Sequence, residues 1–141
     1  MRSVVQRVTR ARVVVDGDVV GELPGPGLVA LVAATHDDGP DDVATTVRKI
    51  AELRIMPGEL SVSDAGGGVL VISQFTLYGQ TTKGRRPSWG LAAPGDVAEP
   101  LVDAVADQLR ARGLAVATGV FGADMQVELV NDGPFTVIVD S

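Results

Sequence analysis

The chain has 141 residues, a length that can bury one substantial core, and we predict a single domain over residues 1–141. Its 45% hydrophobic and 21% charged residues exclude a disordered chain, and the absence of cysteine excludes disulfides, thiolate nucleophiles and cysteine zinc sites. A net charge of −6 argues against general nucleic-acid binding. Polar residues interrupt the first apolar residues too soon for a signal peptide, so we expect a cytoplasmic protein without membrane attachment.

The first half of the chain predicts a hairpin, a buried strand and a helix. A hairpin is expected over residues 13–20, because Asp16-Gly17 accepts the positive φ angles of a two-residue turn. The continuous apolar run over residues 28–34 is typical of a strand buried on both faces. Apolar residues then recur at helical spacing over residues 41–54, which predicts an amphipathic helix.

The second half predicts further strands and a second helix. Residues 56–68 resemble a loop with at most one short strand, and a buried strand over residues 69–72 runs directly into Ser73. Pro94 or Gly95 opens a helix that is closed by Gly113. Its expected apolar stripe is Val97, Leu101, Ala104, Val105 and Leu109, and three more strands are expected over residues 114–118, 125–130 and 135–139. The fold class is therefore α+β, a single domain with a largely antiparallel or mixed, barrel-like sheet packed by two helices.

The cations of this acidic chain gather in two segments that lack acids. Four arginines lie in residues 1–12, and Lys83, Arg85 and Arg86 lie in residues 79–90. A locally basic face is one interpretation. Solvated surface cations on a strand and a loop are the other, and charge alone favours it.

Few side chains are available for acid–base or metal chemistry. The one histidine, His36, precedes two aspartates and is more typical of a surface or capping residue than of a base. The carboxylates lack the spacing of a metal site, and Gly66-Gly67-Gly68 lacks the lysine and helix of a phosphate loop, so neither metal nor cofactor is predicted. An enzyme built from this chain would use hydroxyls, amides and backbone groups, which suits an activated ester substrate.

Two short motifs offer such groups. Residues 73–77 follow a buried strand, where amides leave the ladder and could stabilise an oxyanion, although an ordinary strand with alternating faces is the alternative. Gly133-Pro134 interrupts an apolar run and marks a turn, an edge or a cis bond. Trans is the default for such a bond, whereas a cis bond would make the nearby carbonyls a rigid pair of acceptors for an α-ammonium group.

Both motifs resemble signatures of the D-aminoacyl-tRNA deacylases. Ser73-Gln74-Phe75-Thr76-Leu77 is similar to the family's Ser-Gln-x-x-Leu, and residues 131–136, Asn-Asp-Gly-Pro-Phe-Thr, are similar to its Asn-x-Gly-Pro-x-Thr. The resemblance extends to residues 6–8, the loop over residues 83–88 and residues 121–125. Residues 56–68 are shorter than the family's segment, and Trp89 stands where phenylalanine is expected.

The resemblance implies a homodimer that hydrolyses the ester between a D-amino acid and its tRNA, with the Ser73–Thr76 segment as the catalytic motif. It implies that the amide of Phe75 stabilises the oxyanion, assisted by the terminal ribose 2′-hydroxyl. Thr76 is expected to have a supporting role, because no base is evident beside it. Gln74 and Met125 are expected to line the pocket.

The resemblance also implies that Gly133-Pro134 is cis and enters the partner's active site, where it rejects L-amino acids. Arg7 is expected to brace this segment, with Asn131 and Thr136 in support, and Lys83, Arg85 and Arg86 are candidates for binding tRNA phosphates. Exclusion of L side chains by backbone would leave glycyl-tRNA as a substrate. The alternatives are a non-catalytic RNA-binding module, an esterase or peptidase of small D-amino acid derivatives, and a structural dimer with a trans bond.

Overall fold

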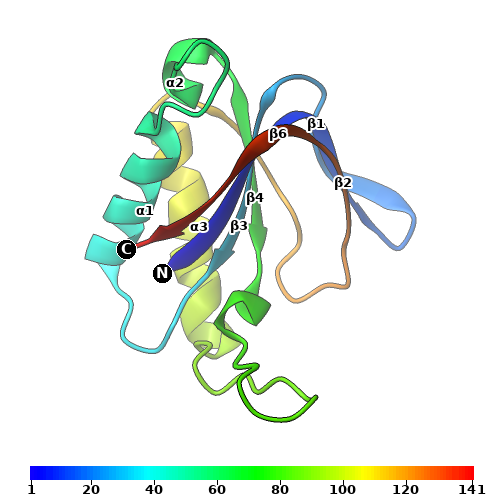
Figure 1. Cartoon of the computed structure of the whole chain (residues 1–141), viewed down its shortest axis with the longest axis vertical. Helices are drawn as coiled ribbons and strands as arrows, with labels where there is room; N and C mark the ends of the chain where they lie inside the picture. The colour runs from blue at the N-terminus through cyan, green and yellow to red at the C-terminus, as the bar shows by residue number, and fades with distance from the viewer.

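The computed structural model describes every residue from Met1 to Ser141. Six strands, three α-helices and one 3-10 turn follow one another along the chain (Figure 1). Their bounds are β1 Arg2–Val15, β2 Asp18–Leu23, β3 Gly27–Ala33, α1 Pro40–Glu52, α2 Val62–Ala65, β4 Gly68–Ser73, η1 Phe75–Tyr78, α3 Gly95–Ala111, β5 Ala115–Thr118 and β6 Gln126–Asp140. No helix is both long enough and apolar enough to cross a bilayer.

The long strand β1 organises a mixed sheet. On one side it pairs with β6, and on the other side its first half pairs with β3 and its second half with β2, all antiparallel. Strands β4 and β5 continue from β3 in parallel. At the far edges β2 and β5 approach so closely that a Cβ on Gly21 would collide with the Thr118 carbonyl oxygen. The sheet is therefore nearly closed, which confirms the predicted α+β, barrel-like fold.

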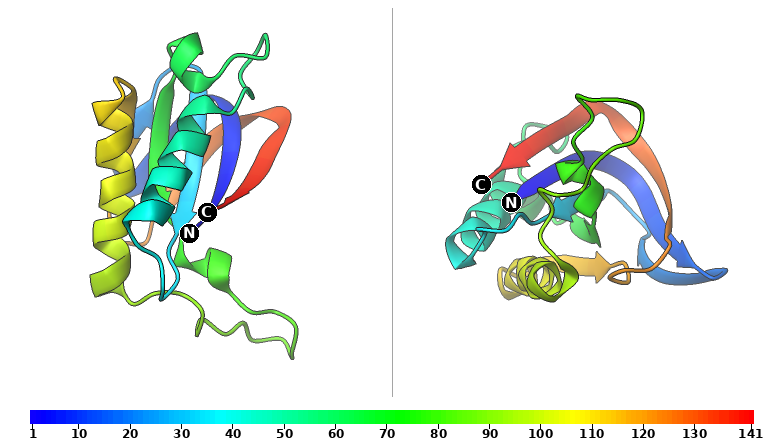
Figure 2. Two further views of the ribbon diagram at one scale, coloured as in Figure 1. Left: turned by 90° about the vertical axis from the view of Figure 1, so that its left-hand side faces the viewer. Right: turned by 90° about the horizontal axis from the view of Figure 1, so that it is seen from below.

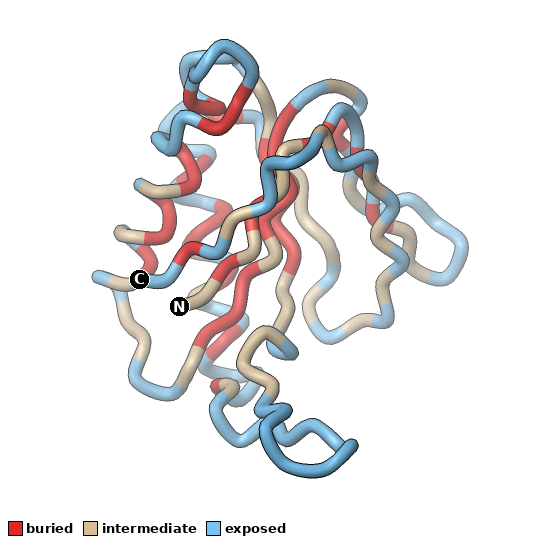
Figure 3. Tube along the Cα trace, viewed as in Figure 1, coloured by how far each residue is buried: buried red, intermediate tan, exposed pale blue.

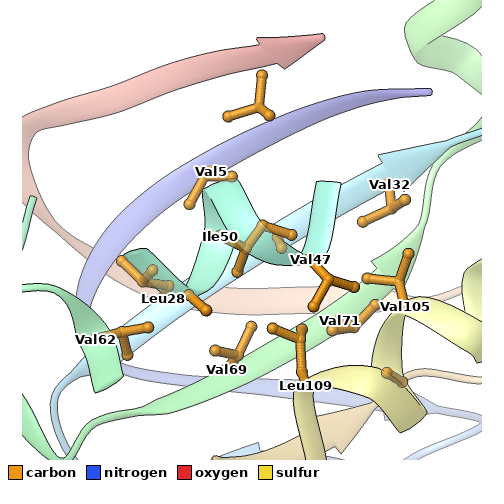
Figure 4. Packing of buried hydrophobic residues seen from close by; sticks show 14 of the residues in the cluster. Val5, Leu28, Val32, Val47, Ile50, Val62, Val69, Val71, Val105 and Leu109 are labelled. Atoms are coloured by element: carbon orange, nitrogen blue, oxygen red, sulfur yellow. The ribbon is translucent and has the colours of Figure 1, made fainter. Parts of the chain in front are cut away.

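Helices α1 and α3 lie side by side against one face of this sheet (Figure 2). Their apolar faces and the facing side of β3 and β4 form the larger core, and the side chains point into the space between helices and sheet (Figure 4). The opposite faces of the same strands form a smaller core inside the barrel. Buried residues accordingly follow the strands and the inner helix faces, whereas the tip of the loop after η1 is exposed (Figure 3).

Two segments differ from the sequence-based predictions. Residues 62–65 form the short helix α2, capped by the Ser61 hydroxyl, which accepts a hydrogen bond from the Asp64 amide at 3.0 Å. The two strands expected over residues 125–130 and 135–139 are one continuous strand, β6, because the chain returns to β1 after a local bulge. The hairpin at Asp16-Gly17 is confirmed, and both residues have positive φ angles, 49° and 84°.

The ends of β1 and β6 are joined beside η1. Arg2 Nε donates to Asp140 Oδ1 at 2.9 Å, and the Arg2 guanidinium lies 5.5 Å from the centre of the Tyr78 ring. The hydrogen bond from Arg2 holds the pKa of Asp140 below its ordinary value, and burial raises the pKa of Tyr78. Arg2 thus connects both strand ends with the 3-10 turn.

The lowered pKa of Asp140 predicts a loss of stability in acid. A carboxyl whose pKa is depressed by folding stabilises the folded state above its unfolded pKa of about 3.9, and this contribution disappears as the pH falls through the folded pKa. The pair is exposed, so Asp140→Asn should lower stability at pH 7 by no more than about 1 kcal/mol. Thermal unfolding of both proteins should converge between about pH 4 and pH 2, and a difference that persists at the acid end would contradict this origin.

Candidate active site

The first predicted motif lies where β4 leaves the sheet. Ser73 is the last residue of β4, and the Gln74 amide donates to the Val32 carbonyl of neighbouring β3 at 2.8 Å. The chain then turns into η1, so residues 75–78 are not an extension of the strand. The Gln74 side chain donates from Nε2 to the Thr76 hydroxyl oxygen. The motif is therefore a strand end followed by one tight turn.

A cavity of about 260 Å³ opens beside this turn, between β3, the start of α3 and Phe121. None of its lining side chains is charged, and the only polar ones belong to Ser73 and Gln74. The lining residues are Val32, Ala33, Ala34, Ser73, Gln74, Phe75, Ala93, Gly95, Ala98, Val102, Phe121 and Gly122. An apolar wall with a few polar groups at one end is typical of small-molecule sites.

Two backbone donors are free at the edge of this cavity. Phe75 and Thr76 open the 3-10 turn, so their amides have no carbonyl within the turn to bind. Neither amide forms a hydrogen bond elsewhere in the chain, and both residues are exposed. The Phe75 ring is 54% exposed and meets the Trp89 ring edge to face, with centroids 5.4 Å apart. These two unpaired N–H groups are therefore candidate donors to an oxyanion at the cavity.

The loop after η1 carries the predicted phosphate-binding cations. Gln80 and Ser88 close its base through two backbone hydrogen bonds of 2.8 and 3.1 Å. Lys83, Arg85 and Arg86 are exposed and form no ion pair. The loop therefore presents three uncompensated positive charges next to the turn at residues 75–78.

No general base lines the cavity, although a smaller hollow that shares Ser73, Val102 and Phe121 with it contains Asp103. The imidazole of His36 is exposed, and its Nε2 lies 2.8 Å from the Gly90 carbonyl oxygen, which agrees with a surface role. No group of three or more His, Asp or Glu side chains is arranged to hold a metal ion. The polar side chains that line the cavity are the Ser73 hydroxyl and the Gln74 amide, and the Gln74 amide binds the Thr76 hydroxyl.

The second predicted motif forms a bulge in β6. In the pairing of β1 with β6, Gln6 lies opposite Thr136 and Val8 opposite Asn131, so four residues, 132–135, stand opposite Arg7 alone. The Gly133–Pro134 peptide bond within them is cis. Gly133 and Pro134 have no pairing partner in β1, and their carbonyl oxygens accept no hydrogen bond from the loops or side chains of the protomer.

Arg7 and Asn131 hold the two ends of this bulge. Arg7 Nε donates to the Asp132 carbonyl at 3.0 Å and lies 3.0 Å from the Asp132 carboxylate, while its guanidinium packs 4.3 Å from the Phe135 ring centre. Asn131 Nδ2 donates to the carbonyls of Arg7 and Phe135 at 2.9 and 3.2 Å. Thr136 receives a hydrogen bond from Gln6 at 3.1 Å. The side chains named in the prediction thus surround Gly133-Pro134.

Within one protomer the two motifs do not meet. The middle of β6 arches over the upper part of the molecule in Figure 1, whereas η1 and the basic loop lie at the lower end. Met125 is also separate from the cavity, because its sulfur packs over Gly119 and its side chain lies against the core inside the barrel. Of the two residues expected to line the pocket, only Gln74 does so in the protomer.

The comparisons with known proteins decide the family. The family model described as D-Tyr-tRNA(Tyr) deacylase matches residues 4–140. This chain belongs to the D-aminoacyl-tRNA deacylase family. Proteins named D-aminoacyl-tRNA deacylase from Kineococcus radiotolerans and Beutenbergia cavernae are each 64% identical to it over 141 residues, covering 100% of both chains. Streptomyces coelicolor has one that is 61% identical over 140 residues, or 99% of each chain.

Solved structures agree with the fold of this deacylase family member. A structure titled c-Myc DNA Unwinding Element Binding Protein superposes with a TM-score of 0.91 at 38% identity, covering 100% of this chain and 99% of the other. A probable eukaryotic D-amino acid tRNA deacylase superposes with a TM-score of 0.86 at 20% identity, covering 99% and 98%, and supports the fold.

In this member of the deacylase family, most residues of the cavity wall were not predicted from the sequence. Ala93, Ala98 and Val102 line it but belong to no recognisable motif, and Phe121, which lies in a segment similar to the family, was not predicted to line the pocket. The small residues at the start of α3 were the available signal, since alanine and glycine facing a strand end leave room for a ligand. Whether these residues line a cavity depends on how α3 packs against β3, which the sequence does not show.

Proposed function

We propose that this chain hydrolyses the ester bond of D-aminoacyl-tRNA to the free D-amino acid and tRNA. Family membership supports the reaction, and the observation that carries the mechanism is the pair of free amides at Phe75 and Thr76 beside an uncharged cavity. An aminoacyl ester is activated, so positioning and oxyanion stabilisation can supply most of the catalysis.

The proposed chemistry uses the backbone of η1. Water attacks the ester carbonyl carbon, the Phe75 amide donates to the developing oxyanion, and the ester C–O bond breaks to leave the hydroxyl on the terminal ribose. The substrate's own 2′-hydroxyl helps to position the reacting groups. Thr76 accepts a hydrogen bond from Gln74 and has no base beside it, which supports a positioning role.

The cavity of one protomer is incomplete for such a substrate. It holds no charged side chain that could bind the α-ammonium group, and at about 260 Å³ it is smaller than most ligand pockets, which span roughly 300–1,000 Å³. The bulge of β6 has unpaired carbonyls at Gly133 and Pro134. We therefore propose a homodimer in which the bulge of each protomer completes the partner's cavity.

Backbone recognition would explain selectivity for the D configuration. With the ammonium and ester carbonyl fixed, exchanging hydrogen and side chain on the α-carbon converts D into L, and a backbone wall excludes any L side chain. Glycine has no side chain to exclude. Glycyl-tRNA should therefore be hydrolysed measurably, whereas L-aminoacyl-tRNA should not.

Turnover separates this proposal from a binding module or a small-molecule esterase. Wild-type protein in excess over D-tyrosyl-tRNA should release D-tyrosine, and it should act far more slowly on D-tyrosine methyl ester, which lacks the tRNA. Binding of D-tyrosyl-tRNA without release would support the binding module instead. Equal rates on both esters would support the small-molecule esterase.

The basic loop predicts salt-dependent binding. Replacing Lys83, Arg85 and Arg86 by glutamine should weaken tRNA binding and reduce the slope of log K against log salt by about 0.7–0.9 for each phosphate that is no longer bound. Arg112→Gln is a suitable control, because Arg112 is a surface arginine already paired with Glu52 at 2.7 Å. An unchanged salt slope in the loop variant would show that these residues are solvated surface cations that do not bind tRNA phosphates.

A second candidate function follows from the name of one solved structure. The 38% identical structure is titled as a DNA-unwinding-element binding protein, and the basic loop could also attract DNA phosphates. Competition distinguishes the two functions. An excess of DNA duplex should leave hydrolysis of D-tyrosyl-tRNA largely intact if tRNA is the ligand, and should suppress it if DNA binds the same loop more tightly.

A further inference from the structure

The unpaired cations of this acidic chain occur beside the bulge as well as in the basic loop. Six cationic side chains form neither an ion pair nor a side-chain hydrogen bond, although the net charge is −6. Three of them are in the basic loop, and the other three are Arg10, Arg48 and Arg54. Arg10 and Arg54 are both exposed. Arg10 pairs with a residue of β6 near the start of the bulge, and Arg54 precedes a residue that is hydrogen-bonded to Arg7.

Arg10 reaches the bulge along β1. It pairs with Val130 of β6, next to the Val8–Asn131 pair where the bulge begins. Its side chain lines a cavity of about 200 Å³ between β1, β2 and β6. Glu22 and Glu128 line the same cavity, and Glu128 forms its ion pair with Arg12 at 2.6 Å, so Arg10 forms no ion pair of its own although two carboxylates lie nearby.

Arg54 reaches the bulge from the loop after α1. The next residue, Ile55, accepts a hydrogen bond from Arg7 Nη1 at 3.2 Å, and the same guanidinium donates to the Asp132 carbonyl. Arg7 therefore links the backbone beside Arg54 directly to the bulge. One unpaired arginine therefore lies in each of two segments that are hydrogen-bonded to the chain around Gly133-Pro134 or to Arg7, which holds it.

We propose that Arg10 and Arg54 bind phosphates of the tRNA whose acylated end occupies the partner protomer's cavity. This inference rests on the proposed function, in which the bulge meets the aminoacyl group across the dimer. The phosphates of the terminal nucleotides are covalently joined to that group, so they must pass close to whatever surrounds the bulge. Guanidinium groups match phosphate oxygens in bidentate geometry, and the acidic protein has few other free cations to offer.

The position of the two cationic surfaces makes the inference specific to a dimer. In one protomer the basic loop lies at the lower end of Figure 1 and the middle of β6 arches over the upper part. In the dimer, the basic loop of one protomer and the bulge arginines of its partner would contact the same tRNA from two sides.

The test uses two substrates and matched arginine variants. The double variant Arg10→Gln/Arg54→Gln is compared with wild type and with Arg48→Gln, which replaces an exposed arginine of α1 that forms no ion pair or hydrogen bond with the bulge. The substrates are D-tyrosyl-tRNA and 2′(3′)-O-D-tyrosyl-adenosine, which lacks phosphates. Thermal melts of all three proteins check that the variants fold.

We expect the double variant to lower the ratio of kcat/KM for the tRNA ester to that for the adenosine ester. The slope of log kcat/KM against log salt on the tRNA ester should fall by about 1.4–1.8, the value for two phosphates, while Arg48→Gln keeps the wild-type slope. If the wild type is active and the double variant keeps the wild-type salt slope, this inference is wrong and the proposed function is unaffected. A wild type that hydrolyses neither ester would overturn the proposed function and this inference with it.

Discussion

Replacing Phe75 by proline should lower kcat on D-aminoacyl-tRNA by about 10²–10³-fold, the usual effect of removing one oxyanion donor. Phe75 is the first residue of η1, a position where proline fits because its missing N–H has no partner within the turn. Gln74 before it has φ −146° and ψ 71°, outside the helical region that a following proline disfavours. The substitution should therefore remove the amide donor while keeping the turn.

The comparison that isolates the amide is Phe75→Ala, which removes the same ring, and its packing against Trp89, but keeps the N–H. Single-turnover hydrolysis of D-tyrosyl-tRNA by both variants measures the difference. If the alanine variant loses as much activity as the proline variant, the ring and not the amide supports the reaction. A near wild-type rate in the proline variant would show that the Phe75 amide does not stabilise the oxyanion.

Substituting Arg7 by alanine should cost stability and D-selective activity together. Arg7 is only 12% exposed and binds the Asp132 carboxylate as well as the carbonyls of Asp132 and Ile55. Removing it leaves these acceptors without their donor and deprives Phe135 of its cation, so we expect a loss of about 2–3 kcal/mol in the free energy of unfolding. Hydrolysis of D-tyrosyl-tRNA should fall at temperatures where the variant is still folded, because the bulge is no longer held.

Arg12→Ala is the matched control on the same strand. Arg12 binds Glu128 through a similar ion pair, but both partners are about half exposed, and solvent screens such a pair so that its loss should change stability little. Arg7→Lys should recover part of the stability and little of the activity, since an ammonium cannot reproduce the planar fork of donors. Equal losses in the Arg7 and Arg12 variants, by urea unfolding and by hydrolysis, would contradict the bracing role.

The sequence was sufficient to predict the parts of the fold that depend on local chemistry. The Asp16-Gly17 turn, the buried strands and the two long helices follow from turn residues and apolar periodicity, and all are present. Helix α2 was missed because four residues are too few to show a helical period. The sequence predicted two strands in place of β6 because a Gly-Pro pair usually ends a strand. In the structure β1 pairs with β6 on both sides of the bulge.

The site was predictable only where a motif marked it. Ser73 and Gln74 line the cavity and Arg7 is hydrogen-bonded to the bulge; these segments could be selected from the sequence because they belong to recognisable signatures, and their roles stay predictions. The cavity wall depends on which face of α3 meets the strands. The buried face includes Ala98 and Val102. Val105 and Leu109 of the predicted stripe are buried with them, whereas Val97 is 37% exposed because Ala98 faces the strands at the start of the helix.

The central claim is selective hydrolysis of the D ester, and the ratio of kcat/KM for D-tyrosyl-tRNA to that for L-tyrosyl-tRNA tests it most directly. Both substrates carry the same tRNA and the same side chain, so the ratio reports only the configuration at the α-carbon. The proposed backbone exclusion predicts a ratio well above about 10², within the range that a built-in steric clash can supply, with glycyl-tRNA between the two. A ratio near one, or hydrolysis of neither ester, would contradict it.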